Sequence, residues 1–280
     1  MKMSTGKKIE NIILSILKYF SLCLATFIAV IPIVVCVFTA FKTDEEYAST
    51  NVMTLPKSWF YFENFKIAWQ KADMLKGFMN TAFILLIVLS GSIMIGAMLA
   101  YILNRFKFKG NALIRNLFLF ATLIPGVATQ VTVYQIMNSL NLVYTMHGYI
   151  ILMLGTDVIS IYVFLQFFEN LPISLDESAI MDGSTYFGVF FKILLPLLKP
   201  AMVTCMILKG VGVYNEYYMS NLYIPGKTIS TALYKFTGPF GSQYNYICAG
   251  VIITIIPALI VFICCQKQIY SGLAVGAVKG

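Results

Sequence analysis

Long apolar stretches alternate with short polar links along this chain. Runs of largely apolar residues, each roughly 20 or more long, fall in segments 12–41, 77–103, 113–137, 148–168, 197–222 and 246–265. An α-helix needs about 20 apolar residues to cross the hydrocarbon layer of a bilayer. The pattern therefore predicts an all-α integral membrane protein, with six transmembrane helices in a single domain over residues 1–280.

The composition supports the same fold class. Of the 280 residues, 59% are hydrophobic and only 11% are charged, far from the balance of a soluble domain. The first apolar run is too long for a signal peptide and lacks a clear small-residue cleavage site, so we expect an uncleaved first helix. Three prolines, Pro32, Pro125 and Pro257, lie in or near the runs, where neighbouring helices tolerate a kink.

Basic residues in the short links predict the orientation. Lysines precede the first run, and Arg105, Lys107, Lys109 and Arg115 crowd the link between the second and third. The positive-inside rule places both segments in the cytoplasm of a bacterial cell, and with six spans both chain termini are cytoplasmic. The net charge of +8 therefore reflects topology, and no nucleic-acid partner is implied. The external loops then fall at about 42–76, 138–147 and 225–245.

Several kinds of chemistry are excluded. The six cysteines all lie in predicted spans, which argues against a disulfide framework, and the single His147 has no partner at metal-ligand spacing. Residues 225–228 end like a phosphate-binding loop, but Asn221 stands where the loop needs glycine. We therefore expect no enzyme activity, no metal and no cofactor bound by this chain.

One polar segment, at about 169–198, separates the fourth and fifth runs. Ser174 and Glu177 have the spacing of a capping box, which predicts a helix beginning at Leu175. Gly183 would end that helix, and Ser184 would cap a second one that ends at Pro196. Such a helix pair outside the membrane is either a docking element or an ordinary amphipathic hairpin.

The same residues resemble the EAA loop of ABC importer permeases. That pattern is EAA, three residues, Gly, nine residues and then I-x-L-P; here Glu177-Ser178-Ala179 is followed by Gly183 and by Ile193 to Pro196, and only Ser178 departs. The resemblance implies a coupling helix that docks on a partner ATPase. Glu177 would be a cap and a partner to a basic group of the ATPase, and Asp182 a polar contact. The implied coupling residues are Asp176, Glu177, Ser178, Ala179, Asp182, Gly183 and Pro196.

Five further segments resemble the second, shorter permease of maltose-type carbohydrate importers. They are 56–69, 100–110, 124–130, 214–218 and 272–280, the last departing slightly at Ala274 and Val275. The resemblance implies a type I importer permease that moves a sugar or oligosaccharide. It also implies four partners: a second permease in a heterodimer, two ATPase subunits that bind ATP and Mg, and an external solute-binding protein.

The fifth apolar run carries a candidate substrate path. Lys209, Gly212 and Glu216 have spacings that place them on one helix face, and ionisable groups at membrane depth usually face a protein interior or a wet cavity. Sugars offer hydroxyls to polar groups and C–H faces to aromatic rings. Alternatively, Lys209 and Glu216 form an ion pair between helices at the permease interface. The candidate path comprises Lys209, Gly212, Asn215, Glu216, Tyr217 and Tyr218.

The last external loop is rich in turn residues and aromatic rings. The resemblance implies that it enters the binding protein and displaces the sugar; the alternative is that the rings pack on the outer surface of the permease. Its candidate residues are Tyr234, Phe236, Gly238, Pro239, Gly241 and Tyr244.

Two other function classes and one other substrate remain open. A secondary transporter would leave the EAA-like segment unexplained, and an assembly factor without a solute path would leave Lys209 and Glu216 unexplained. Glycerol phosphate or another polyol derivative is the alternative substrate, because permeases of this type also carry such molecules.

Overall fold

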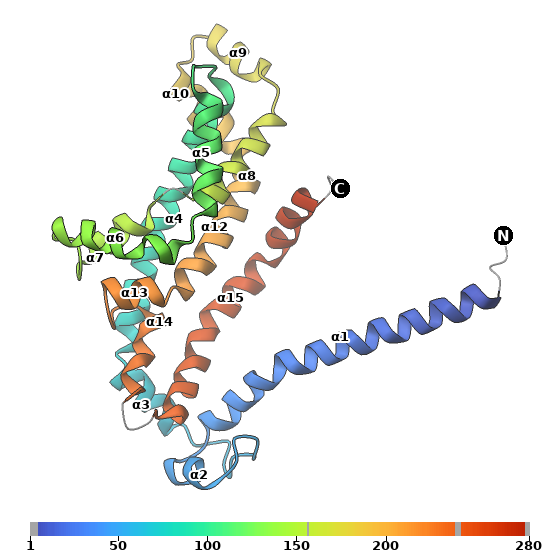
Figure 1. Ribbon diagram of the computed structural model, residues 1–280, viewed down its shortest axis with the longest axis vertical. Helices are drawn as coiled ribbons and strands as arrows, with labels where there is room; N and C mark the ends of the chain where they lie inside the picture. The colour runs from blue at the N-terminus through green and yellow to red at the C-terminus, as the bar shows by residue number, and fades with distance from the viewer. Residues whose placement is uncertain (1–4, 156, 239–241, 278–280) are drawn as a thin grey trace. The chain divides into compact units, whose positions relative to one another are not determined.

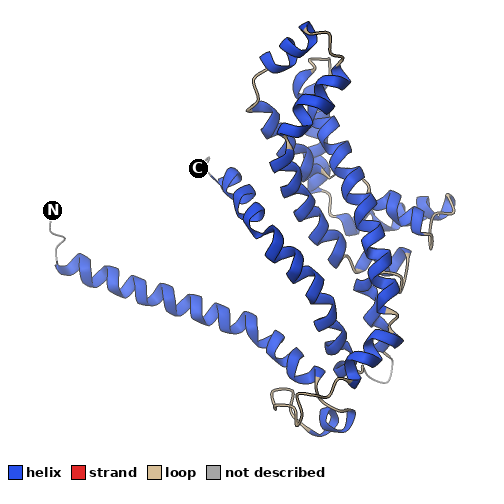
Figure 2. Ribbon diagram, turned by 180° about the vertical axis from the view of Figure 1, so that it is seen from behind, coloured by secondary structure: helices blue, strands red, loops and turns tan. Residues whose placement is uncertain are grey.

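The computed structural model describes residues 5–155, 157–238 and 242–277, and within them every regular element is helical (Figure 2). This confirms the prediction of an all-α protein. The chain divides into two compact units, one formed by residues 1–73 and 235–256 and the other by residues 74–234 and 257–280. Each unit has its own packing.

The first unit joins the N-terminal helix to the start of the last helix. Asn64 donates from Nδ2 to the carbonyls of Ala40 and Lys42, and Asp44 accepts from Asn245 and from the Tyr246 hydroxyl. These bonds fold the polar link after the first helix against the last helix, so the link is ordered by buried polar groups. Its helices are α1 (Thr5–Ala40), α2 (Asp44–Ser49), α3 (Glu63–Lys71) and the beginning of α15 (Tyr244–Ala277).

The second unit holds the remaining helices. Figure 1 shows α4 running beside α8 and α12, with the short α9 at one end of this bundle. The elements are α4 (Met74–Arg105), α5 (Asn111–Leu123), α6 (Gly126–Ser139), α7 (Met146–Met153), α8 (Val158–Glu169), α9 (Ser174–Met181), α10 (Tyr186–Gly188), the π-helix η1 (Val189–Leu194), α11 (Leu195–Leu197), α12 (Lys199–Asn215), α13 (Tyr218–Tyr223) and α14 (Ile229–Ala232), followed by a 3-10 turn, η2 (Leu233–Phe236), at the boundary of the two units.

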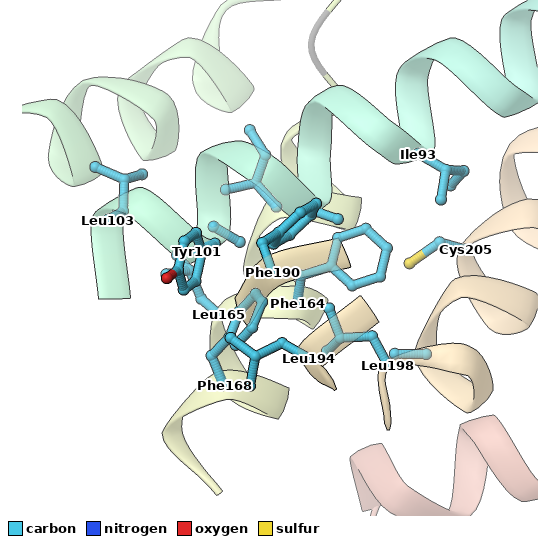
Figure 3. Packing of buried hydrophobic residues seen from close by; sticks show 14 of the residues in the cluster. Ile93, Tyr101, Leu103, Phe164, Leu165, Phe168, Phe190, Leu194, Leu198 and Cys205 are labelled. Atoms are coloured by element: carbon cyan, nitrogen blue, oxygen red, sulfur yellow. The ribbon is translucent and has the colours of Figure 1, made fainter. Parts of the chain in front are cut away.

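The core of the second unit lies where α4, α8 and η1 meet (Figure 3). Small residues on α4 allow close packing: a Cβ at Gly96 would stand 3.6 Å from Ser160 Cβ and from the Phe164 ring, which is ordinary contact distance. The Tyr101 ring lies 5.3 Å from that of Phe190. This packing brings the end of α4 close to the segment that the sequence singles out.

Three helices are long and apolar enough to cross a membrane: Ile13–Ala40, Met74–Arg105 and Tyr244–Gln266. Three bent pairs pass the same test: Asn111–Leu123 with Gly126–Ser139 at 102°, Met146–Met153 with Val158–Glu169 at 42°, and Tyr186–Leu197 with Lys199–Asn215 at 74°. The described part of the chain thus supplies up to six spans if each bent pair counts as one. Pro125 lies at the sharpest bend, where it lacks the N–H that would continue the helix.

The predicted bounds of the fifth span are wrong at both ends. The apolar pair already begins at Tyr186, and α12 ends at Asn215 rather than continuing to Leu222. Glu216 has an extended backbone, with φ −68° and ψ 101°, so the helix breaks there before α13. Tyr217, Tyr218 and Met219 follow the polar Asn215 and Glu216, so the apolar run extends past the break and the hydropathy pattern did not reveal it.

Candidate functional site

The EAA-like segment forms the predicted helix and turn, but with different caps. Ile173 is the N-cap of α9 and already has helical dihedrals, so Ser174 lies inside the helix, and no side-chain capping bond forms. The predicted capping box of Ser174 and Glu177 is therefore wrong. A serine caps a helix from an extended backbone just before the first turn, and here the Ile173 carbonyl starts the turn by accepting from Glu177 N at 3.2 Å.

Gly183 ends α9 as predicted. Its φ of +87° lies in the left-handed region, and a Cβ there would meet nothing within 4 Å. The requirement for glycine is thus conformational rather than steric. Beyond it, Ser184 N donates to the Ala179 carbonyl at 2.9 Å, and this bond closes the end of the helix.

The second helix of the segment differs from the prediction at both ends. Its cap is Thr185, whose Oγ1 accepts from Gly188 N at 3.2 Å, rather than Ser184. The helix also continues past Pro196 to Leu197 before it bends, because Pro196 lies in the first turn of α11, where its missing N–H is tolerated. This segment is therefore continuous with the apolar bent pair that ends at Asn215.

The residues of α9 point in two directions. Asp176 and Ala179, three positions apart, are buried against the unit, whereas Met181 is 87% exposed. The outward side of this short helix therefore exposes both polar and apolar groups. Of the other predicted coupling residues, Glu177, Ser178, Asp182, Gly183 and Pro196 are all exposed.

Asp176 forms an ion pair with Arg105, a residue that the sequence predicted only as part of a basic cytoplasmic link. Arg105, the last residue of α4, places Nε 2.7 Å from Asp176 Oδ2, and the two side chains are 7% and 9% exposed. Burial raises the pKa of the Asp176 carboxyl, and the charge of Arg105 opposes that shift. The basic position and the acidic first turn are both visible in the sequence, but no local pattern links residues so far apart.

Four of the six candidate path residues, 215–218, lie at the break after α12, and Lys209 and Gly212 lie within that helix. Lys209 is half-buried, while Gly212 and Asn215 are exposed; Tyr217 and Tyr218 follow the break and are 42% and 52% exposed. The Asn215 side chain donates back to the Val211 carbonyl at 3.1 Å. The structure thus places the two tyrosines at an accessible corner between two helices.

Glu216 does not share a helix face with Lys209, so the spacing argument is wrong for this residue. It lies outside α12, and its Oε1 accepts from Met219 N at 2.9 Å, in the first turn of α13. Among the described residues, no ion pair joins Glu216 to Lys209. In the structure, the Glu216 carboxylate therefore satisfies a free N–H in the first turn of α13.

The segment after α13 is folded rather than an open loop. Ile229 N donates to Thr81 Oγ1 at 3.0 Å, which fixes α14 on α4. Phe236 is buried with its ring 5.6 Å from that of Tyr246, while Tyr234 and Tyr244 are 56% and 51% exposed. Gly238 is also exposed, and Pro239 and Gly241 lie outside the described residues.

A groove that the sequence did not predict lies between α5 and α8. It encloses about 560 Å³, and its lining includes Arg115, Glu169 and Gln166 together with apolar side chains. Arg115 Nη2 stands 3.8 Å from Glu169 Oε1, a loose and partly exposed pair. The described residues contain no cluster of three or more side chains able to hold a metal ion.

Comparison with known proteins establishes the family. Residues 92–269 match the model of the binding-protein-dependent transport system inner membrane component family, and the chain belongs to this family. The match begins within α4 and covers the rest of the bundle, the EAA-like segment and most of α15.

Individual relatives align over nearly the whole chain. The arabinooligosaccharides transport system permease protein AraQ of Halalkalibacterium halodurans is 29% identical over 98% of this chain and 100% of its own length. The probable ABC transporter permease protein YurM of Bacillus subtilis is 32% identical over 89% of this chain and 83% of its own length. A crystal structure of a bacterial ABC transporter involved in the import of alginate contains a chain of the same fold, with a TM-score of 0.77 at 21% identity, covering 95% of this chain and 99% of the other.

Proposed function

We propose that this chain is the permease subunit that carries a sugar or oligosaccharide across the cell membrane in a binding-protein-dependent importer. The observation that carries the proposal is α9: a short helix with an exposed face, ended by Gly183 in the left-handed region, within the EAA-like pattern of residues 177–196. Relatives named for arabinooligosaccharides and for starch degradation products support the substrate class.

The transport energy comes from partner subunits. Two ATPase subunits bind ATP and Mg in the cytoplasm, a second permease completes the path, and an external binding protein delivers the substrate. In this arrangement both chain termini and α9 lie on the cytoplasmic side. The exposed Glu177, Ser178 and Met181 form the contact with one ATPase.

ATP binding is coupled to transport if α9 and the helical run from Tyr186 to Leu197 move together. Closure of the ATPase pair on ATP moves α9, and the helical run from Tyr186 to Leu197 carries the movement toward α12. ATP shifts the permease to its outward-facing state only to the extent that closed ATPases bind that state more tightly. The chain itself contributes no catalytic group.

The substrate path passes the break after α12. Tyr217 and Tyr218 offer aromatic faces to sugar C–H groups, and Asn215 offers an amide to hydroxyls. The exposed Tyr234, whose ring lies 6.3 Å from that of Tyr217, extends the same aromatic set. A path for a phosphorylated polyol would instead need a positively charged side chain to bind the phosphate, and Lys209 is the candidate on α12.

The test is uptake by the reconstituted transporter. The chain, its second permease, its ATPases and its binding protein would be assembled in proteoliposomes and offered labelled arabinooligosaccharides, maltooligosaccharides and glycerol phosphate. We expect ATP-dependent uptake of a neutral sugar. Uptake of glycerol phosphate alone would show that the substrate is a phosphorylated polyol rather than a sugar. Uptake without ATP would contradict the importer mechanism.

A further inference from the structure

A buried ion pair joins the coupling helix to the rest of its own chain through one side chain, Arg105. It extends from the last residue of α4 and forms the 2.7 Å ion pair with Asp176 in the first turn of α9. Both side chains are more than nine-tenths buried. A planar guanidinium can hold several acceptors at once in a fixed geometry, which a lysine cannot do.

The same guanidinium also closes the end of α8. Nη1 donates to the Phe168 carbonyl at 3.3 Å, which also accepts from Leu171 N at 3.1 Å, and Nη2 donates to the Leu171 carbonyl at 3.1 Å, just past the end of α8. The guanidinium carbon stands 5.9 Å from the centre of the Phe168 ring. Arg105 therefore contacts the ends of three helices, α4, α8 and α9, at the point where the coupling helix leaves the bundle.

Asp176 depends on this contact. Its second oxygen, Oδ1, is buried and has no hydrogen-bond partner among the described residues. Without Arg105 the carboxylate would lack a counterion, and α9 would have to turn to bring it to water. The remaining buried contact of α9 is Ala179, whose small side chain cannot fix the helix rotation.

We propose that Arg105 is the positioning residue of the coupling helix: it fixes the rotation of α9 through Asp176, so that movement of the ATPase is transmitted to the bundle. This inference rests on the proposed import function. It goes beyond the proposed function because it assigns Arg105 and Asp176 a role within the chain, where neither has to touch the ATPase or the sugar.

The first measurement is independent of transport. Amide hydrogen exchange would be compared between the wild-type complex and an Arg105→Gln complex, in peptides covering α9 and the turn at Gly183. We expect exchange in α9 to accelerate by about tenfold, since its local opening becomes easier, with no change in α4. Arg115→Gln is the matched control, because that arginine ends in a loose pair 3.8 Å from Glu169. Equal protection of α9 in all three complexes would overturn the proposal.

The second measurement separates positioning from stability. In proteoliposomes, sugar transported per ATP hydrolysed should fall by about tenfold in Arg105→Gln, a typical size for an allosteric coupling, while ATPase assembly and basal hydrolysis persist. The double variant with Asp176→Asn, which removes both charges, should recover part of that ratio. If assembly, hydrolysis and transport fall by the same factor, the contact is merely structural. Absence of sugar import by the wild-type complex would refute the proposed function and leave the exchange result to decide the role of Arg105.

Discussion

The carboxylate of Glu216 accepts a hydrogen bond from the backbone N–H of Met219 at 2.9 Å, across the break between α12 and α13. Its own carbonyl accepts from Ser230 Oγ at 2.8 Å, so the residue connects α12, α13 and the start of α14. An acidic side chain near a helix N-terminus satisfies a free N–H and also favours the helix dipole.

Substitution of Glu216 distinguishes a structural role from a sugar contact. Glu216→Ala should destabilise the permease by about 1 kcal/mol, the usual size of a lost cap, whereas Glu216→Gln keeps an acceptor and should melt near the wild type. The measurement is thermal melting of the purified complex, together with uptake. If Glu216→Gln melts normally yet loses uptake, the charge itself acts on the path, and the capping role is insufficient.

Gly183 provides a test of the coupling turn. Gly183→Val should impose about 1–2 kcal/mol of left-handed strain on the turn after α9 and abolish uptake, while membrane insertion persists. Asn tolerates this backbone region, so Gly183→Asn is the matched control and should retain most activity. Normal stimulation of the ATPase by loaded binding protein in the Gly183→Val complex would contradict the role of this turn.

The phosphate-loop-like residues should have no role in nucleotide binding. Lys227 Nζ donates to the Tyr144 carbonyl at 3.0 Å, and the Lys227 carbonyl accepts from Asn80. Lys227→Ala should therefore lower the melting temperature slightly and leave the nucleotide affinity of the complex unchanged. Titration of the isolated chain with a fluorescent ATP analogue is the direct check, and saturable binding there would refute this expectation.

The sequence predicted the fold class and the helix that ends at Gly183 because both depend on local signals. Apolar runs report membrane helices wherever they occur, and Gly183 at its fixed spacing reports a turn that other residues make only with strain. The cap at Thr185 was missed because Ser184, a residue of similar type, stands beside it, and the cap at Ile173 was missed because it uses no side chain. The choice among them follows from backbone geometry rather than composition.

Contacts between distant residues could not be predicted in the same way. Four helices, α5 to α8, lie between Arg105 and Asp176 in the sequence, and the packing of α4 on α8 brings the two residues together. The helix break at Glu216 was missed for a different reason: no Gly or Pro marks it, and apolar residues continue beyond it.

The segment after α13 offers a final test, because two of its aromatic residues differ sharply in burial. Phe236 is 5% exposed, so Phe236→Ala should destabilise the permease by about 3–5 kcal/mol, the usual range for a buried phenylalanine. Tyr234 is 56% exposed, so Tyr234→Ala should leave the melting temperature unchanged.

If this segment contacts the binding protein or the sugar, Tyr234→Ala should still lower uptake and the stimulation of hydrolysis by loaded binding protein, with basal hydrolysis intact. Uptake equal to the wild type in Tyr234→Ala would remove this residue from the transport path, and destabilisation by Phe236→Ala would then favour packing on the permease as the role of this segment.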